Sequence, residues 1–265
     1  MEFGMPTLLE LDDLQTNIDL ALDLKLSFIE INCNVPEYQV DQMDPEVLKD
    51  LSRRTGIRFT FHLDEFLSIT DPNKAISEAY IASVLSSIEF AKKAGIESLT
   101  MHFLNGVVFT LPHKKVYVYE KYTEYYLDRL RVFRDKVTQA IGTSNISLNI
   151  ENVAGFEPYM RKGIEVLLES PVFGLTYDCG HNARYERKDW DFLQAHQDRI
   201  RHMHVHDVIG KNDHQPFGTG DLNIPAEINF AAKTAAKAVI EVKTAESLAL
   251  AVATLREYQA RQQIK

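Results

Sequence analysis

The chain has only two cysteines, Cys33 and Cys179, among 265 residues. Two thiols cannot build a disulfide framework, and free cysteines are typical of a reducing cytoplasm. No apolar run reaches the roughly 18 residues that a membrane-spanning helix needs. The first residues, MEFGMPTLLELDD, lack the basic and apolar regions of a secretory signal. We therefore expect a cytoplasmic protein with no membrane segment.

Basic residues are also fewer than acidic ones. The 29 Lys and Arg are outnumbered by 38 Asp and Glu, so the net charge is −9 with histidine neutral. The broad basic surface typical of nucleic-acid-binding proteins is therefore missing. Nucleic acid becomes an unfavoured partner, although a local basic patch or metal ions in an acidic pocket could still bind a phosphate group.

Linkers and glycine-rich nucleotide-binding loops are missing as well. The 12 Gly and nine Pro are scattered, and neither GxGxxG nor GxxxxGK[ST] occurs. Closed α/β barrels routinely form one domain of roughly 200–250 residues. We therefore expect residues 1–265 to form a single domain.

Short β-type runs alternate with helical patterns along the whole chain. The expected strands are 3–9, 28–34, 57–62, 98–103, 146–151, 173–178, 200–206 and 238–243. The expected helices are 12–25, 45–55, 73–94, 116–140, 159–168, 189–198, a weaker 226–236, and 244–260. Strict alternation predicts a parallel sheet, since parallel strands need helical crossovers. Eight units favour an α/β fold of the (β/α)8 TIM barrel type. The alternative is an open doubly wound sheet, which would want the glycine-rich first turn that this chain lacks.

Acidic and imidazole side chains gather at the carboxyl ends of the last six expected strands. They are His62, His102, Glu151, Asp178, His204, His206 and Glu241, with His181 following Asp178. In a barrel these strand ends converge on one mouth, where active sites are built. A lone histidine in a strand is usually a hydrogen-bonded core residue, but carboxylates are almost never buried unpaired. Three of them in register with histidines predict a metal site.

The mixture of imidazole and carboxylate identifies the kind of metal. It suits Zn, Mn, Fe or Co, whereas an all-oxygen set would suit Mg or Ca. The side chains of His202, His204 and His206 point the same way, because residues two apart share one face of a strand. We choose His204 as the ligand and expect His206 to hydrogen-bond or to face the mouth. Cys179 should point away from Asp178 and pack in the core.

Several motifs carry a family resemblance. The segments HLDEFLSITDP, MHF, NIENVAG, YDCGH, MHVHD, DHQPFGTGDLN and VIEVK occur in this order from the third expected strand to the last. Together they resemble the xylose isomerase-like TIM-barrel superfamily. That superfamily includes apurinic/apyrimidinic endonucleases of the zinc-barrel type and many sugar or sugar-phosphate isomerases and epimerases.

The resemblance implies one to three divalent ions (Mn, Zn, Co or Fe) per chain. The shared four-ligand site would be formed by Glu151, Asp178, His204 and Glu241. Glu151 would bridge to a second metal held by His62 and His102, and His181 and His214 match ligands of a third. The endonuclease pattern has Asp two residues before the last of these histidines, whereas this chain has Asn212 there and Asp213 next to it. An amide is a poor ligand beside a carboxylate, so this departure disfavours a three-metal phosphodiesterase.

The favoured activity is that of a metal-dependent sugar or sugar-phosphate isomerase or epimerase. A metal polarises the carbonyl, and two carboxylates on opposite faces remove and return the proton. The resemblance assigns this acid/base role to Glu151 and Glu241, and the binding of a substrate hydroxyl to His181. We add His206, Arg184 and Lys211 as candidate substrate-binding residues near the mouth.

Other activities stay open. They are an endonuclease-like phosphodiesterase acting on abasic DNA, a polyol-ketone dehydratase or lyase, and a non-catalytic barrel that binds sugar or metal. A binding protein has no need of two opposed carboxylates, so Glu151 and Glu241 favour catalysis. The aromatic stretch 116–126 could cap the mouth or pack between subunits, which makes a homodimer a candidate.

Overall fold

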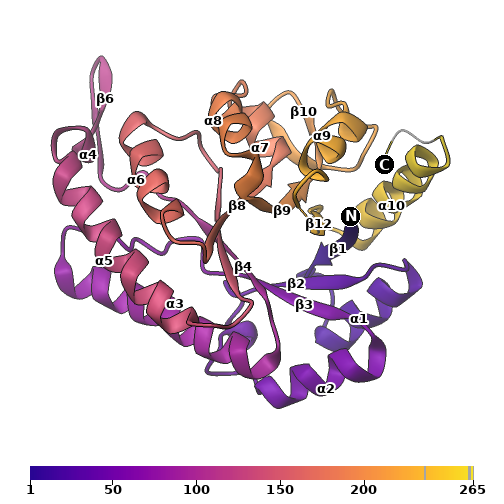
Figure 1. The fold of residues 1–265 in the computed structure, drawn as a ribbon. Helices are drawn as coiled ribbons and strands as arrows, with labels where there is room; N and C mark the ends of the chain where they lie inside the picture. The colour runs from indigo at the N-terminus through magenta and orange to yellow at the C-terminus, as the bar shows by residue number, and fades with distance from the viewer. Residues whose placement is uncertain (236, 262–263, 265) are drawn as a thin grey trace.

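Eight parallel strands close into a barrel in the computed structural model, which describes residues 1–235, 237–261 and 264. Their order around the barrel is β1-β12-β9-β8-β7-β4-β3-β2, and helices surround them (Figure 1). The strands are β1 (Glu2–Pro6), β2 (Phe28–Asn32), β3 (Arg58–His62), β4 (Ser98–His102), β7 (Ser147–Glu151), β8 (Phe173–Asp178), β9 (Ile200–Val205) and β12 (Lys237–Ile240). The (β/α)8 barrel expected from the alternation is confirmed.

Helices connect successive strands over the outside of the barrel. The longer ones are α1 (Leu14–Asp23), α2 (Pro45–Thr55), α3 (Lys74–Ala94), α5 (Thr123–Ile141), α6 (Pro158–Leu168), α9 (Ile224–Ala231) and α10 (Ala245–Ala260). The short ones are η1 (Pro36–Tyr38), α4 (Val118–Lys121), α7 (Cys179–Arg184), α8 (Trp190–Ala195) and η2 (Gln197–Arg199). Local sequence sets their ends: the Asn73 side chain accepts from the Ala75 N–H at the start of α3, and Gly95 ends it at φ 76°. No helix within the described ranges is long and apolar enough to cross a membrane.

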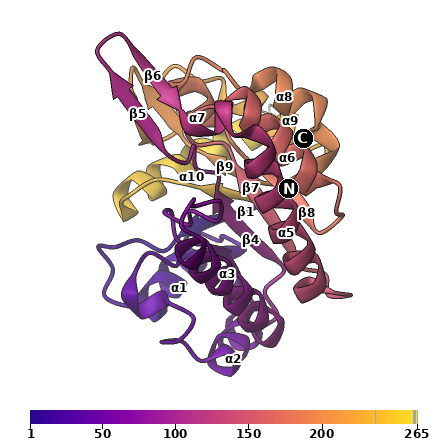
Figure 2. The ribbon, with the colours of Figure 1, turned by 90° about the vertical axis from the view of Figure 1, so that its left-hand side faces the viewer.

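The expected helix 116–140 is wrong at its start. Residues 114–117 form β6 (Lys114–Tyr117), which pairs antiparallel with β5 (Val108–Leu111) before α4 and α5 follow. This hairpin projects from the body of the molecule (Figure 2). Valine and aromatic residues around Pro112 favour strands over a helix. The helical pattern of the residues that follow Tyr117 extended into this strand in the prediction, so the start of the helix was placed too early. Within the aromatic stretch, Tyr119 and Tyr126 are buried, whereas Tyr122 and Tyr125 are exposed.

Other boundaries shift by a few residues. The strand expected over 238–243 ends at Ile240, so Glu241 directly follows it and still donates its backbone N–H to Val205 O. The helix expected over 226–236 starts at Ile224, where the Asn223 side chain caps Ala226 N–H; residue 236 lies outside the described residues. A second hairpin was not expected: β10 (Asp207–Ile209) pairs antiparallel with β11 (Asn212–Gln215) beside the barrel mouth.

Residue alternation along the strands makes the barrel interior polar and the layer under the helices apolar. In β2, the apolar Ile29 and Ile31 are fully buried on either side of Glu30. The hydroxyls of Thr100 on β4 and Thr176 on β8 are hydrogen-bonded at 3.0 Å, although these strands are not neighbours. Only side chains that point into the barrel can meet in this way. The same alternation directs the groups at the strand ends toward one mouth.

Candidate metal centre at the barrel mouth

A cavity of about 520 Å³ opens at the carboxyl ends of the strands. Its wall includes Asn32, His62, His102, His181, Arg184, Asp213, His214, Glu241 and Lys243. These residues come from distant parts of the chain and meet here because the barrel closes. Half of the imidazole and carboxylate groups that the sequence placed at strand ends, namely His62, His102, His181 and Glu241, therefore line one cavity.

His204, at the end of β9, is the centre of a cluster of carboxylates. Its Nδ1 lies 3.2 Å from Glu151 Oε1, 3.2 Å from Glu241 Oε2 and 3.9 Å from Asp178 Oδ2. The potential ligand atoms of these four residues all lie within 4.8 Å of one another. They are the four residues that the resemblance assigned to the shared metal site, and the fold brings them together.

The carboxylates of this cluster are poorly satisfied without a cation. Among the described residues, Glu151 Oε2 and Glu241 Oε2 are buried and have no hydrogen-bond partner, which is costly for a carboxylate. Burial favours a raised pKa for Glu151, but the nearby charges of His204 and His102 hold that pKa well below its usual range. An anionic, buried and partly unpaired cluster of one imidazole and three carboxylates fits a divalent metal ion.

Asp178 shows how the local sequence builds the site. It ends β8, where its backbone N–H donates to Asn152 Oδ1 and its carbonyl accepts from Asn152 Nδ2. Its side chain then caps α7 by accepting the His181 N–H at 2.6 Å. The single helical turn brings the His181 ring back over Asp178, with Nδ1 3.3 Å from Asp178 Oδ2.

A second group surrounds the other oxygen of Glu151. His62 Nε2 lies 3.3 Å and His102 Nε2 3.5 Å from Glu151 Oε2. Burial lowers the pKa of His102, whereas Glu151 overcomes burial at His62 and raises the pKa of that ring to about 9. These are the residues that the resemblance assigned to a second metal, and they do lie around the expected bridging carboxylate.

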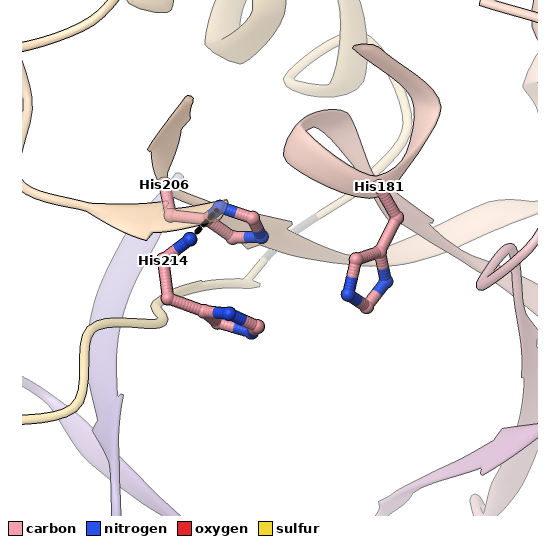
Figure 3. Close-up of side chains that lie close together, drawn as sticks. All are labelled: His181, His206 and His214. Carbon is pink, nitrogen blue, oxygen red and sulfur yellow. Dashed lines mark hydrogen bonds between the residues drawn. The ribbon is translucent and has the colours of Figure 1, made fainter. Parts of the chain in front are cut away.

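A third group contains three histidines (Figure 3). The rings of His206 and His214 stack with centroids 4.4 Å apart, and the ring of His181 stands nearly perpendicular to both. The backbone N–H of His214 donates to His206 Nδ1 at 2.8 Å, and His206 Nε2 lies 3.2 Å from Asp178. His206 is fully buried and lies beside the cavity rather than on its wall, so its substrate-binding role stays a prediction. A Cβ at Gly180 would lie 2.0 Å from the His206 ring, so only glycine fits there.

The two basic residues predicted to bind substrate, Arg184 and Lys211, differ in position. Arg184 lines the cavity and donates to Asp213 at 2.5 Å, whereas Lys211 is exposed at the turn of the β10–β11 hairpin and away from the cavity wall. Asp213 also lies 3.0 Å from His214 Nδ1, so this carboxylate, and not the exposed Asn212, faces the histidines. His214 adopts φ 55°, a left-handed conformation that is uncommon outside glycine.

No role was assigned from the sequence to three residues at the site. Glu30 and His202 are buried next to the cluster, and Lys243 lines the cavity. Glu30 on β2 lies 2.7 Å from His204 Nε2 and 2.9 Å from His202 Nε2. A carboxylate inside the apolar run FIEIN is the same signal that identified Glu151, and it could have identified Glu30. Lys243 follows Glu241 by two residues in VIEVK and donates to its Oε1 at 3.1 Å.

Comparison with known proteins agrees with the fold. A family model described as a xylose isomerase-like TIM barrel matches residues 18–261. Two uncharacterised proteins of Methanocaldococcus jannaschii are each 23% identical to the chain. One alignment covers 84% of this chain and 81% of the relative, and the other covers 97% and 99%.

Solved structures share the whole barrel. A D-tagatose 3-epimerase-like protein has a TM-score of 0.79 at 19% identity, with 98% of each chain covered. The 3-keto-D-glucoside 4-epimerase of E. coli has a TM-score of 0.75 at 15% identity, covering 98% of this chain and 99% of that one. The IOLI protein, solved with a zinc atom, has a TM-score of 0.74 at 16% identity, covering 100% and 99%. At these identities the likeness shows the fold alone.

Proposed function

We propose that this chain, which belongs to the xylose isomerase-like TIM barrel family, is a metal-dependent sugar or sugar-phosphate isomerase or epimerase. The observation that carries the proposal is the cluster of His204 with Glu151, Asp178 and Glu241 beside an open cavity. Sugar epimerases among its structural neighbours support the substrate class. A cavity of about 520 Å³ is within the usual size for small-molecule sites.

The four clustered residues would hold one divalent ion of Mn, Zn, Co or Fe. When bound, such an ion supplies Lewis-acid polarisation of a substrate carbonyl. Glu151 and Glu241 are ionised, because the pKa of each is held well below its usual range despite burial. Ionised carboxylates are the form that binds a metal ion.

The protein's own groups would move the proton. Glu241 lines the cavity and takes the proton from the carbon next to the carbonyl, and the electron pair of the broken C–H bond moves toward the carbonyl oxygen as an enediolate forms. Glu151 lies 3.2 Å from the same His204 Nδ1 as Glu241 does. For epimerisation, the Glu151 carboxylate takes up a proton from water and delivers it to the opposite face of the same carbon, while Glu241 releases to water the proton that it removed. For isomerisation, Glu241 returns its proton to the neighbouring carbon while a proton moves between the two enediolate oxygens. His181, on the cavity wall, binds a substrate hydroxyl.

The proposal is tested by proton exchange at the substrate carbon. Metal-reconstituted protein is incubated in D₂O with a panel of ketoses and ketose phosphates, and deuterium next to the carbonyl is measured by NMR. A positioned general base contributes roughly 10²–10⁴-fold, so Glu241→Gln should reduce exchange by about that factor at saturating metal. Glu246→Gln is the matched control, because Glu246 is exposed at the start of α10 and lies outside both the cavity lining and the cluster. Absence of exchange with every sugar would contradict the proposal.

A second candidate function is phosphodiester hydrolysis with clustered metals. It is favoured by the two further groups, His62 and His102 around Glu151 and His181 and His214 near Asp213. The net charge of −9 argues against a DNA substrate. Two or three tightly held Zn ions per chain, together with cleavage of an abasic oligonucleotide, would make this function the better one.

A further inference from the structure

A buried group of one carboxylate and two imidazoles lies beneath the proposed metal cluster, inside the barrel. It consists of Glu30 on β2, which is 2% exposed, and of His202 and His204 on β9, which are fully buried. Glu30 Oε1 lies 2.9 Å from His202 Nε2, and Glu30 Oε2 lies 2.7 Å from His204 Nε2. The Thr60 hydroxyl also donates to Oε1, at 3.3 Å. Each oxygen of this carboxylate therefore faces a different imidazole.

These distances are those of a carboxylate paired closely with two ring nitrogens, and they are shorter than the spacing of two ligands around one metal ion. Ligand atoms about 2.0–2.2 Å from a tetrahedral zinc ion would lie about 3.3 Å from each other. Separations of 2.7 and 2.9 Å are instead ordinary lengths for an N–H donating to a carboxylate. Glu30 carries two acceptor oxygens and no donor when ionised, so both imidazoles must present an N–H from Nε2.

This arrangement decides which nitrogen of His204 is left for the cluster. A neutral imidazole has one N–H and one lone pair. If Nε2 carries the N–H toward Glu30, the lone pair lies on Nδ1, and Nδ1 is the atom that faces Glu151, Asp178 and Glu241 at 3.2–3.9 Å. Partners of this kind fix the ring orientation and tautomer of metal-binding histidines in general.

We propose that Glu30 is a positioning residue that fixes His204 with its Nδ1 lone pair toward the metal cluster, while His202 holds the second oxygen of Glu30 in place. The inference rests on the metal site of the proposed function. Glu30 acts through His204, and His202 acts through Glu30.

An isosteric amide at position 30 separates this role from simple packing. Glu30→Gln keeps the shape but offers one acceptor and one donor, so it cannot accept from both rings. If its amide N–H faces His204, the ring proton moves to Nδ1 and blocks the ligand atom. If it faces His202, the proton of that ring moves to Nδ1, for which the described residues provide no partner. Both arrangements penalise the metal-competent state.

The experiment measures metal affinity rather than turnover. Zinc binding to wild type, Glu30→Gln and Thr60→Val is measured by competition with a chelator. Loss of partners behind a metal-binding histidine typically costs about 10–100-fold in affinity, and this is the weakening expected for Glu30→Gln. Thr60→Val removes a donor to the same carboxylate without removing either contact with an imidazole, so it should weaken zinc binding by clearly less than Glu30→Gln does. Equal affinity for wild type and Glu30→Gln would overturn the inference.

A second measurement needs no variant. In zinc-loaded wild type, the ¹⁵N and ¹H NMR signals of His204 should show a proton on Nε2 and a metal-bound Nδ1. A metal-bound Nε2 with a proton on Nδ1 would overturn the inference even if zinc binds well. If wild type binds no zinc, manganese, cobalt or iron, both the inference and the proposed function fail. If it binds metal but Glu30→Gln binds equally, the inference alone fails.

Discussion

Addition of a single methyl group at Gly180 should destabilise the metal-free protein. Gly180 lies in α7 at a backbone conformation that other residues can adopt, since its φ is not positive. Helix propensity alone would then make Gly180→Ala stabilising by up to about 1 kcal/mol. Packing opposes this, because the added Cβ would lie 2.0, 2.3 and 2.7 Å from three atoms of the His206 ring. Contacts this short require the buried ring to move.

The free-energy cost of moving the His206 ring exceeds the gain in helix propensity from alanine. Overpacking a buried site typically costs about 1–3 kcal/mol. The ring also holds a 3.2 Å contact with Asp178 and accepts the His214 N–H, and a hydrogen bond to a charged group contributes about 1.5–3 kcal/mol. The free energy of unfolding should therefore fall by about 1.5–5 kcal/mol in total.

Urea denaturation of the metal-free protein measures this change, and a double-mutant cycle assigns its cause. In a His206→Ala background the clash is absent, so Gly180→Ala should become neutral or stabilising by up to about 1 kcal/mol. If Gly180→Ala is as stable as wild type, or if its cost is the same in both backgrounds, the packing argument is refuted.

Three further predictions concern charge, substrate binding and the loop beside the mouth. The pKa of His62 is raised to about 9, above its unfolded value near 6.5. The contribution of protonated His62 to the free energy of unfolding should therefore be complete below about pH 6.5 and be lost as the pH rises toward 9. Unfolding of the metal-free protein at a series of pH values tests this. Arg184→Met should raise the KM for the substrate about 10-fold because Arg184 lines the cavity, whereas Lys211→Met should leave KM unchanged; similar effects of both would contradict the assignment. Asp207→Asn should cost about 1.5–3 kcal/mol, because the Asp207 carboxylate accepts four backbone N–H groups, including those of Gly218 and Gly220; an unchanged melting temperature would refute this.

The barrel was predictable because its signal is repeated along the chain. Each barrel strand is a short, mostly apolar run that ends in a polar residue or directly before one. A helical pattern follows each run, so an error in one unit leaves the number of units unchanged. The helix start at 116 failed because β5 and β6 are an extra hairpin within one unit. The residues of such an insertion have the composition of strands, but they do not follow the strand–helix alternation that identifies the barrel.

The position of the candidate site at the strand ends and the strand face of each side chain could be predicted from the sequence, but the depth of each side chain in the barrel could not. Alternation placed His202, His204 and His206 on one face, and depth in the barrel then separated them: His204 meets the carboxylates, His206 meets Asp178 and His214, and His202 lies below with Glu30. Depth depends on the register between strands, for example His204 beside Asp178 and Val239. Register is a property of the closed barrel, so a single sequence does not display it.

The central claim is that the cluster of His204 with Glu151, Asp178 and Glu241 holds a divalent metal ion. The most direct test is the metal content per chain of the native protein, measured by elemental mass spectrometry and repeated on Asp178→Asn. The account predicts at least one Mn, Zn, Co or Fe ion per chain in the wild type and a clear loss in the variant. A wild-type protein that holds no metal, even after reconstitution with each of these ions, would contradict it.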